Sequence, residues 1–258
     1  MSTKIDSRAL VSPKAVLGRG VVVGPYAVIG DNVTIGSGTV IDSFAQVLGN
    51  THVGEDCRIF SYAVLGSITQ DLKYKGERSY LAIGSRNIIR EFVTMNSGTE
   101  KDSKTVVGDD NLFMVYSHVA HDCVVGNGNV FANNATLAGH VAIENKSIIG
   151  GLSAIHQFCR VGSHAIIGGC SKVVQDIPPY SMCDGHPALV RGLNIVGLRR
   201  AKFSLASITK LKKAFKILFF DNHPFAHAKE LVKKELSSSA EITYLLEFIS
   251  SSKRGIGK

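Results

Sequence analysis

The chain has 258 residues and a mass of 27.6 kDa, and 45% of its residues are apolar, enough for one large or two modest domains with a buried core. No apolar run reaches the roughly 18 residues of a membrane span, and the amino-terminal segment MSTKIDSRALVSPKA lacks the apolar core of a signal peptide. We therefore expect a cytoplasmic protein without stable membrane insertion. The net charge is +8, and residues 191–258 hold 14 Lys and Arg against 5 Asp and Glu, which suits nucleic acid, an anionic membrane or an acidic protein partner.

Five cysteines are scattered singly along the chain, with no C-x-x-C pair. An odd, scattered set is typical of reduced thiols rather than of a disulfide framework or a zinc knuckle. We expect these cysteines to fill small spaces in the core.

A six-residue repeat, clearest in AVLGRG VVVGPY AVIGDN VTIGSG from Ala15, has an aliphatic third position. Of the 29 positions in this phase from Ile5 to Val173, 26 are apolar. Each hexapeptide is predicted to form a short strand and a corner, often with Gly, Asn or Asp in the left-handed or tight backbone of the corner. Three hexapeptides then close an 18-residue triangular coil. This pattern predicts a mostly β protein, a parallel β-helix over residues 1–187, and what is known of such repeats implies the left-handed form.

The three exceptions to the phase fall in two polar segments, TQDLKYKGERSY (69–80) and TEKDSK (99–104). We expect both to be loops extruded from the coil. A loop that interrupts a solenoid is often used for function, and a tolerated surface insertion is the alternative.

Helical spacing replaces the repeat towards the carboxyl terminus, so residues 188–258 are predicted to form a basic α-helical domain. Ser204 is a candidate cap for LASITKLKKAFKILFF, Pro224 opens PFAHAKELVKKEL, and SAEITYLLEFISS forms a third helix. The many lysines there indicate either a solvated helix surface or a docking surface for a partner.

Several histidines are predicted to converge on one corner of the coil. With an 18-residue coil, Val119, Leu137 and Ile155 stack about 4.8 Å apart. The polar residues next to this column on successive coils are His118, His121, His140, His156 and Gln157. Scattered surface histidines are the alternative interpretation.

The same corner contains the elements of an acyl-transfer site. His121 is a candidate general base, Asp122 its orienting carboxylate, and Gly139, 18 residues after His121, a backbone N–H donor for an oxyanion. A zinc site made of three histidines is the competing hypothesis. Asp122 directly after His121 disfavours it, as does the absence of a clear third ligand in the pattern that the β-helical carbonic anhydrases use, so we expect no metal.

Five motifs together resemble the UDP-N-acetylglucosamine O-acyltransferases of lipid A biosynthesis over nearly the whole chain: TQDLKYKGE, HVAHDCVVGN, NNATLAGHV, IIGGLSAIHQFCRVG and PPYSMCDGHPALVRGLNIVGLRR. The resemblance implies a homotrimer with active sites between subunits. It also implies transfer of an (R)-3-hydroxyacyl group from acyl carrier protein to the sugar 3-hydroxyl in the first step of lipid A synthesis. No cofactor is expected, because the phosphopantetheine arrives on the carrier protein.

The resemblance also assigns roles to individual residues. It implies that His121, Asp122 and Gly139 are catalytic, and that Gly169 sets the acyl-chain length by leaving a groove open for a long chain. The residues implied to bind substrate are Asp71, Lys73, His118, His140, His156, Gln157, Asn194 and Arg200. This chain departs from the family pattern at Val196 and Ala201, where family members often have an acidic and a basic residue, respectively.

Two other functions remain open. The related N-acyltransferase of the same pathway shares the repeat but typically carries an additional amino-terminal domain, whereas here the repeat begins by Ile5. A β-helical scaffold with a nucleic-acid-binding tail explains the charge but not the histidine corner. Its tail also lacks the interleaved exposed aromatic residues on which bases would stack, so we expect no nucleic-acid partner.

Overall fold

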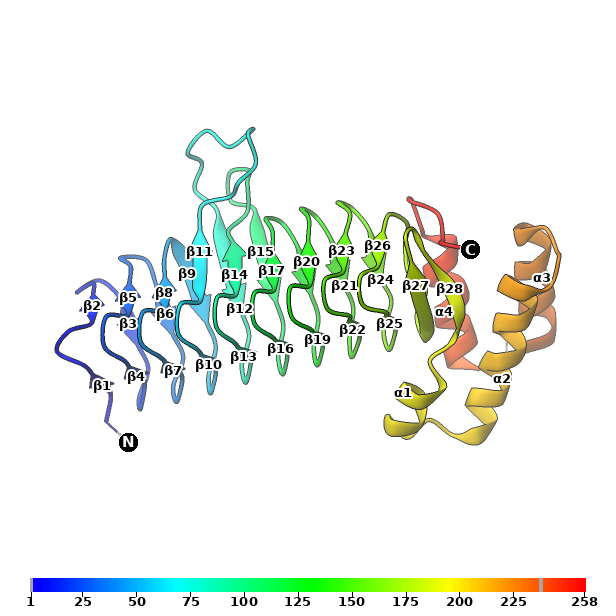
Figure 1. Cartoon of the computed structure of the whole chain (residues 1–258), viewed down its shortest axis with the longest axis horizontal. Coiled ribbons are helices and arrows are strands. Elements are labelled where there is room, and N and C mark those ends of the chain that lie inside the picture. Colours follow the sequence, from blue (N-terminus) through cyan, green and yellow to red (C-terminus); the bar gives the residue numbers. More distant parts are fainter. Residues whose placement is uncertain (1, 237–238) are drawn as a thin grey trace.

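The structure, a computed structural model that describes residues 2–236 and 239–258, confirms the left-handed parallel β-helix (Figure 1). In the coil, strands of two to four residues alternate with corners, and every third strand lies in the same sheet. The coil therefore has three flat faces, and helices close its carboxyl-terminal end.

Three sheets run along the coil axis. The first contains β1 (Lys4–Ile5), β4 (Val22–Val23), β7 (Val40–Ile41), β10 (Arg58–Ile59), β13 (Ile88–Ile89), β16 (Leu112–Phe113), β19 (Val130–Phe131), β22 (Ile148–Ile149), β25 (Ile166–Ile167), β27 (Ser181–Gly185) and β28 (Ala188–Leu193). The second contains β2 (Leu10–Val11), β5 (Val28–Ile29), β8 (Gln46–Val47), β11 (Val64–Ser67), β14 (Thr94–Asn96), β17 (His118–Val119), β20 (Thr136–Leu137), β23 (Ala154–Ile155) and β26 (Lys172–Val173). The third contains β3 (Val16–Leu17), β6 (Thr34–Ile35), β9 (Asn50–Val53), β12 (Tyr80–Ile83), β15 (Lys104–Val107), β18 (Val124–Val125), β21 (Ala142–Ile143) and β24 (Arg160–Val161).

The strand register confirms the 18-residue coil and both extruded loops. Val119 pairs with Leu137, and Leu137 with Ile155. At the two polar segments the offset is larger, because Tyr80 pairs with Asn50 on one side and with Lys104 on the other. The chain between β11 and β12, and between β14 and β15, therefore leaves the coil and returns to it in phase, and Figure 1 shows these segments rising from the coil.

Inside the coil, the repeat positions form the core. Val119 and Leu137 are completely buried, and the rings of Phe113 and Phe131 stack with centroids 4.6 Å apart. Four cysteines are buried in the core as expected, but Cys170 is exposed at a corner. Cys170 is exposed because it occupies a corner position whose side chain points out of the coil.

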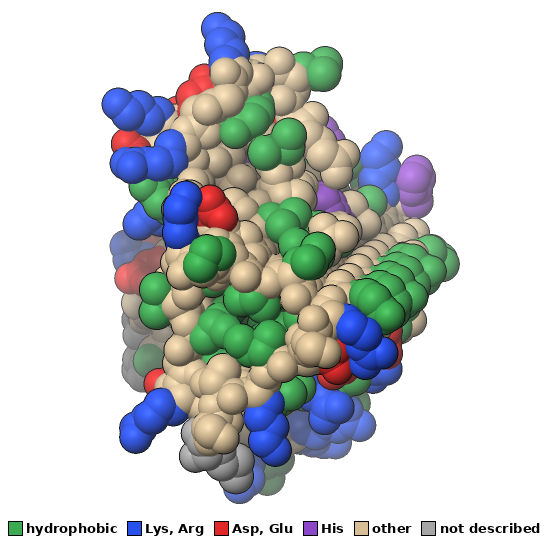
Figure 2. All heavy atoms as spheres, turned by 90° about the vertical axis from the view of Figure 1, so that its left-hand side faces the viewer, with side chains coloured by type: hydrophobic (Ala, Val, Ile, Leu, Met, Phe, Trp, Pro, Cys, Tyr) green, Lys and Arg blue, Asp and Glu red, His purple; other side chains and the backbone are tan. Residues whose placement is uncertain are grey.

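The left-handed corner positions are taken mainly by residues other than glycine, which differs from the expectation. One column of positive-φ residues is aromatic, and its neighbouring rings stack 4.8–5.1 Å apart. Its members are Tyr26, Phe44, Tyr62, Phe92 and Tyr116, all more than a third exposed. A row of hydrophobic side chains along one edge is visible in Figure 2. Stacking between successive coils offsets the cost of the left-handed backbone.

Glycines that directly follow the aliphatic position serve close packing instead. A Cβ on Gly36 would lie 2.4 Å from the backbone carbon of Gly54 on the next coil. Such a contact has no room for a side chain, so glycine is required there for the approach of two backbones.

The helical region has α1 (Ile195–Arg200), α2 (Leu205–Phe215) extended by the π-helical turn η1 (Lys216–Phe220), α3 (Phe225–Leu236) and α4 (Ala240–Ser250). The three expected helices are present, and the Ser204 hydroxyl accepts the capping hydrogen bond from the Ser207 N–H. Helix α1 was not predicted. The boundary expected at residue 187 falls in the turn of the antiparallel β27–β28 hairpin, so β28 belongs to the first sheet and not to the helical region.

Helix α4 packs back onto the coil through polar contacts. The Tyr244 hydroxyl bonds to the Glu144 carboxylate and to Ser163, and the Arg160 guanidinium lies 4.3 Å from the centre of the Phe248 ring. None of the helices in the described part of the chain is long and apolar enough to cross a membrane.

Candidate active site

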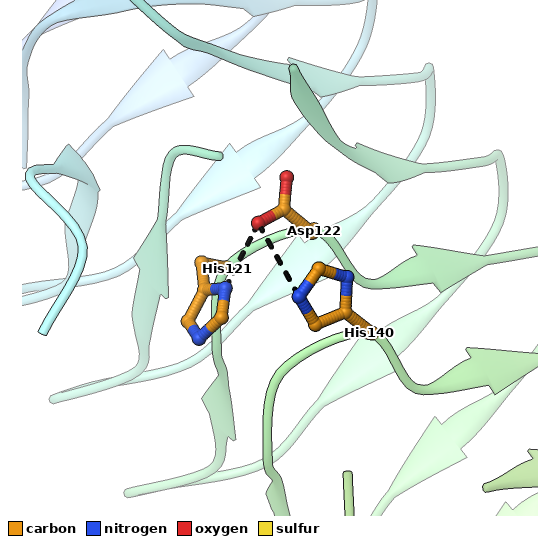
Figure 3. Close-up of side chains that lie close together, drawn as sticks. All are labelled: His121, Asp122 and His140. Atoms are coloured by element: carbon orange, nitrogen blue, oxygen red, sulfur yellow. Dashed lines mark hydrogen bonds and ion pairs between the residues drawn. The ribbon is translucent and has the colours of Figure 1, made fainter. Parts of the chain in front are cut away.

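The predicted catalytic residues meet at one corner of the coil, between the second and third sheets. His121 and Asp122 follow β17, and Gly139 and His140 follow β20 on the next coil. Asp122 and His140 both adopt positive φ, 57° and 59°, at the corner. Figure 3 shows the rings of His121 and His140 turned toward one oxygen of the Asp122 carboxylate. We call His118, His121, His140 and His156 the histidine corner.

Asp122 orients His121. The Nδ1 atom of His121 lies 2.9 Å from Asp122 Oδ2, and the same oxygen accepts a 3.1 Å hydrogen bond from the Thr99 N–H. Burial alone would raise the pKa of Asp122, but hydrogen bonds, that from His121 foremost, outweigh burial and lower the pKa below its usual value. Asp122 is therefore ionised near neutral pH and accepts the Nδ1 proton, which leaves the Nε2 lone pair of neutral His121 available as a base.

The Nε2 atom of His121 approaches Asp71 of the larger extruded loop, and Asp71 in turn lines a cleft. Asp71 of that loop places Oδ2 3.8 Å from Nε2, and its Oδ1 accepts a 2.9 Å hydrogen bond from the Lys73 N–H. The cleft is lined by Asp71, Lys73, Lys75, Glu77, Thr99, Glu100, Lys101 and His140. Both extruded loops thus contribute to the cleft, as does the histidine corner.

Gly139 lies directly against the ring of His121. A Cβ at this position would lie 2.4 Å from Cε1 and 2.5 Å from Nε2 of His121. Any larger residue would displace the ring, so the glycine is required by the position of the imidazole.

His118 is partly buried beside this centre. Burial first, and the charge of His121 next, lower the pKa of His118, so its ring is neutral near pH 7. Its Nδ1 lies 2.7 Å from the Thr94 hydroxyl. The sequence analysis did not find Thr94, because the insertion between β14 and β15 makes the offset between Thr94 and its partner His118 larger than 18 residues. Thr99, in the second loop, was missed for a similar reason.

His156 and Gln157 are exposed on the coil beyond His140, and the ring of His140 stacks on Phe158 there, with centroids 4.8 Å apart. The histidine corner therefore extends over three coils, as expected. Its outer end is more open to solvent than the His121 end.

Asn194, Arg200 and Gly169 lie at other places in this chain. The Asn194 amide donates a 2.9 Å hydrogen bond to the His164 carbonyl, at the corner between the third and first sheets. Arg200 is exposed at the end of α1, and Gly169 lies at the corner between β25 and β26. Within the described part of a single chain, no hydrogen bond or ion pair joins these three residues to the histidine corner.

His121, Asp122 and His140 also have donor atoms within 4.8 Å of one another, a grouping that suits a metal ion. His140 Nε2 lies 3.9 Å from Asp122 Oδ2. However, two ligands of a tetrahedral zinc at about 2.05 Å lie roughly 3.3 Å apart, whereas the His121–Asp122 contact of 2.9 Å is a hydrogen-bond distance. The geometry is that of a hydrogen-bonded pair with a second histidine nearby.

Comparisons with known proteins identify related chains. Residues 176–257 match the family profile described as UDP-N-acetylglucosamine O-acyltransferase, domain 2, and residues 32–67 and 104–139 match the bacterial transferase hexapeptide profile. A Thermodesulfovibrio yellowstonii protein is 50% identical over 254 residues, which covers 98% of each chain, and a Chlorobaculum tepidum protein is 54% identical over 248 residues, 96% of this chain and 94% of that one. Both are named acyl-(acyl-carrier-protein)–UDP-N-acetylglucosamine O-acyltransferase.

Solved structures give the same result. The Bacteroides fragilis UDP-N-acetylglucosamine acyltransferase superposes with a TM-score of 0.96 at 40% identity, covering 98% of this chain and 99% of that one. The Acinetobacter baumannii enzyme superposes with a TM-score of 0.94 at 44% identity and the same coverage. The match in fold and sequence extends through the coil, the extruded loops and the terminal helices, and the chain therefore belongs to the UDP-N-acetylglucosamine O-acyltransferase family.

Proposed function

We propose that this chain transfers an (R)-3-hydroxyacyl group from acyl carrier protein to the 3-hydroxyl of UDP-N-acetylglucosamine, the first step of lipid A biosynthesis. The observation that carries the mechanism is the His121 ring, whose Nδ1 is held by an ionised Asp122 while Nε2 approaches Asp71 at the edge of the cleft. A side chain held in this way is a general base that needs no serine or cysteine nucleophile.

His121 and Gly139 carry the chemical steps. Nε2 of His121 removes the proton of the sugar 3-hydroxyl as the hydroxyl oxygen attacks the thioester carbonyl. The Gly139 N–H donates to the oxyanion of the tetrahedral intermediate. The intermediate then expels the pantetheine thiolate, which takes up the proton from the His121 imidazolium. Asp122 keeps the ring in the required tautomer and stabilises the imidazolium during the reaction.

The remaining corner and loop residues bind the substrates. Asp71 lies next to the His121 Nε2, so its carboxylate can accept a hydrogen bond from a sugar hydroxyl that neighbours the one deprotonated by His121. Lys73, His118 and His140 line or adjoin the same cleft, and His156 and Gln157 extend it along the coil. The pantetheine arrives on its carrier protein, so the reaction uses no cofactor resident in this chain.

A homotrimer completes the site in this proposal. Asn194, Arg200 and Gly169 are implied to line it but lie at other corners of the chain, so a shared site requires a neighbouring copy. The aromatic column and the apolar outer face of the first sheet give such a copy a hydrophobic surface to pack against.

The basic helical region docks acyl carrier protein, which is acidic. Arg199 and Arg200 are both exposed in the last turn of α1, where cations are favoured. Opposite charge speeds the encounter of the two proteins and fixes their orientation. We infer a cytoplasmic location, because the acyl donor of this reaction is carried by acyl carrier protein.

A metal-dependent reaction is the second candidate, favoured only by the grouping of His121, Asp122 and His140. Zinc analysis of the purified protein separates the two mechanisms, because a stoichiometric ion at this group would prevent Asp122 from accepting the Nδ1 proton. We expect less than a tenth of an equivalent of zinc, and full activity after chelation.

The reaction itself is tested with radiolabelled UDP-N-acetylglucosamine and a panel of 3-hydroxyacyl carrier proteins. We expect one ester product at the sugar 3-hydroxyl, with a preference for one chain length. Transfer to an amino sugar but not to UDP-N-acetylglucosamine would instead identify the N-acyltransferase, and no transfer together with tight nucleic-acid binding would support the scaffold.

A further inference from the structure

The carboxyl-terminal tail returns to the coil next to the open end of the histidine corner. After α4, the Ser252 hydroxyl donates a 2.7 Å hydrogen bond to the Asp176 carboxylate, and the Asp176 N–H donates one of 2.9 Å to the Gly255 carbonyl. Gly255 has a φ of +74°, which favours glycine at this turn. The tail is thus anchored on both sides of Arg254, and Figure 1 shows it beside the last coil.

Arg254 links this tail to His156. Its Nε and Nη2 atoms donate to the Val174 carbonyl at 3.3 and 3.2 Å, and Nη2 also lies 3.3 Å from His156 Nδ1. Val174 follows the β26 residue that pairs with Ile155, so it lies one coil beyond His156 in the same column. The guanidinium therefore joins two adjacent coils, and its position is set by the coil backbone rather than by solvent.

The chemistry of this contact determines the tautomer of His156. A guanidinium has only N–H donors, so Nδ1 of His156 must present its lone pair, and the proton of the neutral ring is then on Nε2. The Gln157 carbonyl lies 3.2 Å from the same Nδ1 and would favour the opposite tautomer, because a carbonyl only accepts. A proton on Nδ1 would, however, point at the N–H groups of the guanidinium, and two donors facing each other repel.

We propose that Arg254 is a positioning residue that holds His156 in the Nε2–H tautomer, so that His156 donates a hydrogen bond to a substrate oxygen. The second half of this inference rests on the proposed function, in which His156 contacts substrate. His121 has the opposite tautomer, because Asp122 accepts its Nδ1 proton. One corner therefore presents a base at one end and a donor at the other, and the carboxyl-terminal tail sets the donor.

The tautomer is measured directly by two-bond proton–nitrogen correlation spectra of ¹⁵N-histidine-labelled protein without substrate, with the His156 signals assigned from the spectrum of His156→Gln. In the wild type we expect a protonated Nε2 and an unprotonated Nδ1. Arg254→Met should give a mixture with the Nδ1–H form, which the Gln157 carbonyl then stabilises. Arg254→Lys should restore the wild-type pattern, because lysine is also only a donor.

Lys253→Met is the matched control, since it removes the same charge from the exposed neighbouring residue. It should leave the His156 spectrum unchanged. Hydrogen exchange of the Asp176 amide shows whether the tail stays docked in each variant. A wild-type His156 with its proton on Nδ1 would overturn the tautomer assignment, and an unchanged Nε2–H form in Arg254→Met, whether or not the tail stays docked, would overturn the role of Arg254.

Kinetics test the role of the donor. We expect Arg254→Met to raise the KM of the substrate that His156 contacts by about fivefold, the effect of one hydrogen bond, with kcat changed less than twofold. In a His156→Gln background the same change should have no further effect. An altered tautomer with unchanged KM values for both substrates would refute the substrate-donor role alone, whereas a wild type that transfers no acyl group would refute the proposed function and not the tautomer.

Discussion

Gly139→Ala should destroy the catalytic geometry of His121 while the coil stays folded. The new Cβ would lie 2.4 Å from Cε1 and 2.5 Å from Nε2 of the imidazole, whereas non-bonded carbon atoms are stable at about 3.5 Å or more. The ring must therefore move by roughly 1 Å, and this either breaks the 2.9 Å contact with Asp122 or turns Nε2 away from the cleft. A displacement of about 1 Å at a reacting group costs on the order of 10²-fold in rate.

The assay is kcat for hydroxyacyl transfer with both substrates saturating, together with thermal unfolding to confirm the fold. Gly30→Ala is the matched control: Gly30 lies after β5 at the same kind of corner, and its new Cβ would be 3.5 Å from the nearest atom, an ordinary contact. We expect Gly30→Ala to retain the wild-type rate. Full turnover by a folded Gly139→Ala protein would refute the placement of His121 as the base.

Three further predictions concern pH, chain length and salt. Although burial opposes it, hydrogen bonding lowers the pKa of Asp122 below 3.8, so the stability contributed by the carboxylate is present above about pH 4 and is lost as the pH falls through the lowered pKa. The difference in free energy of unfolding between the wild type and Asp122→Asn, followed by denaturant titration, should shrink as the pH falls from about 5 to about 3; a constant difference would contradict this. Gly169→Met should shift the preference toward shorter acyl donors in a competition assay, if Gly169 leaves an acyl groove open as the family resemblance implies. Its new Cβ would lie 3.2 Å from the Gly151 carbonyl oxygen, a tight contact, and an unchanged preference would show that the acyl chain is measured elsewhere. Changing both Arg199 and Arg200 to Glu should raise the KM for acyl carrier protein. In the wild type this KM should also rise with ionic strength above about 0.15 M, where charges are screened beyond about 8 Å. A KM that responds neither to the substitutions nor to salt would exclude this docking surface.

Much of the fold was predictable because the coil is one-dimensional. An inward aliphatic residue every six positions fixes which residues stack, so His121, Gly139 and His140 were placed together by counting in eighteens. This counting works only where no residues are inserted. Thr94 lies beside His118 because an extruded loop lengthens the turn between them, and only the strand register reveals the changed offset.

Contacts outside the repeat were not predictable in this way. The β27–β28 hairpin and α1 have no six-residue phase, so neither element was predicted from the repeat. Arg254 and His156 are 98 residues apart in the chain and meet because α4 folds back onto the coil, through contacts that no local pattern encodes. The aromatic corner column was also missed, because its left-handed backbone is stabilised by stacking between coils rather than by the intrinsic preference of each residue.

The general-base role of His121 is the central claim, and His121→Ala tests it most directly. The measurement is the rate of hydroxyacyl transfer to the 3-hydroxyl of UDP-N-acetylglucosamine at saturating substrates, with the product identified by mass spectrometry. The ring lies on the outside of the coil, so the variant should unfold at nearly the wild-type temperature. We predict a fall in kcat of about 10²- to 10⁴-fold. A folded His121→Ala protein that turns over within about threefold of the wild-type rate would contradict the mechanism.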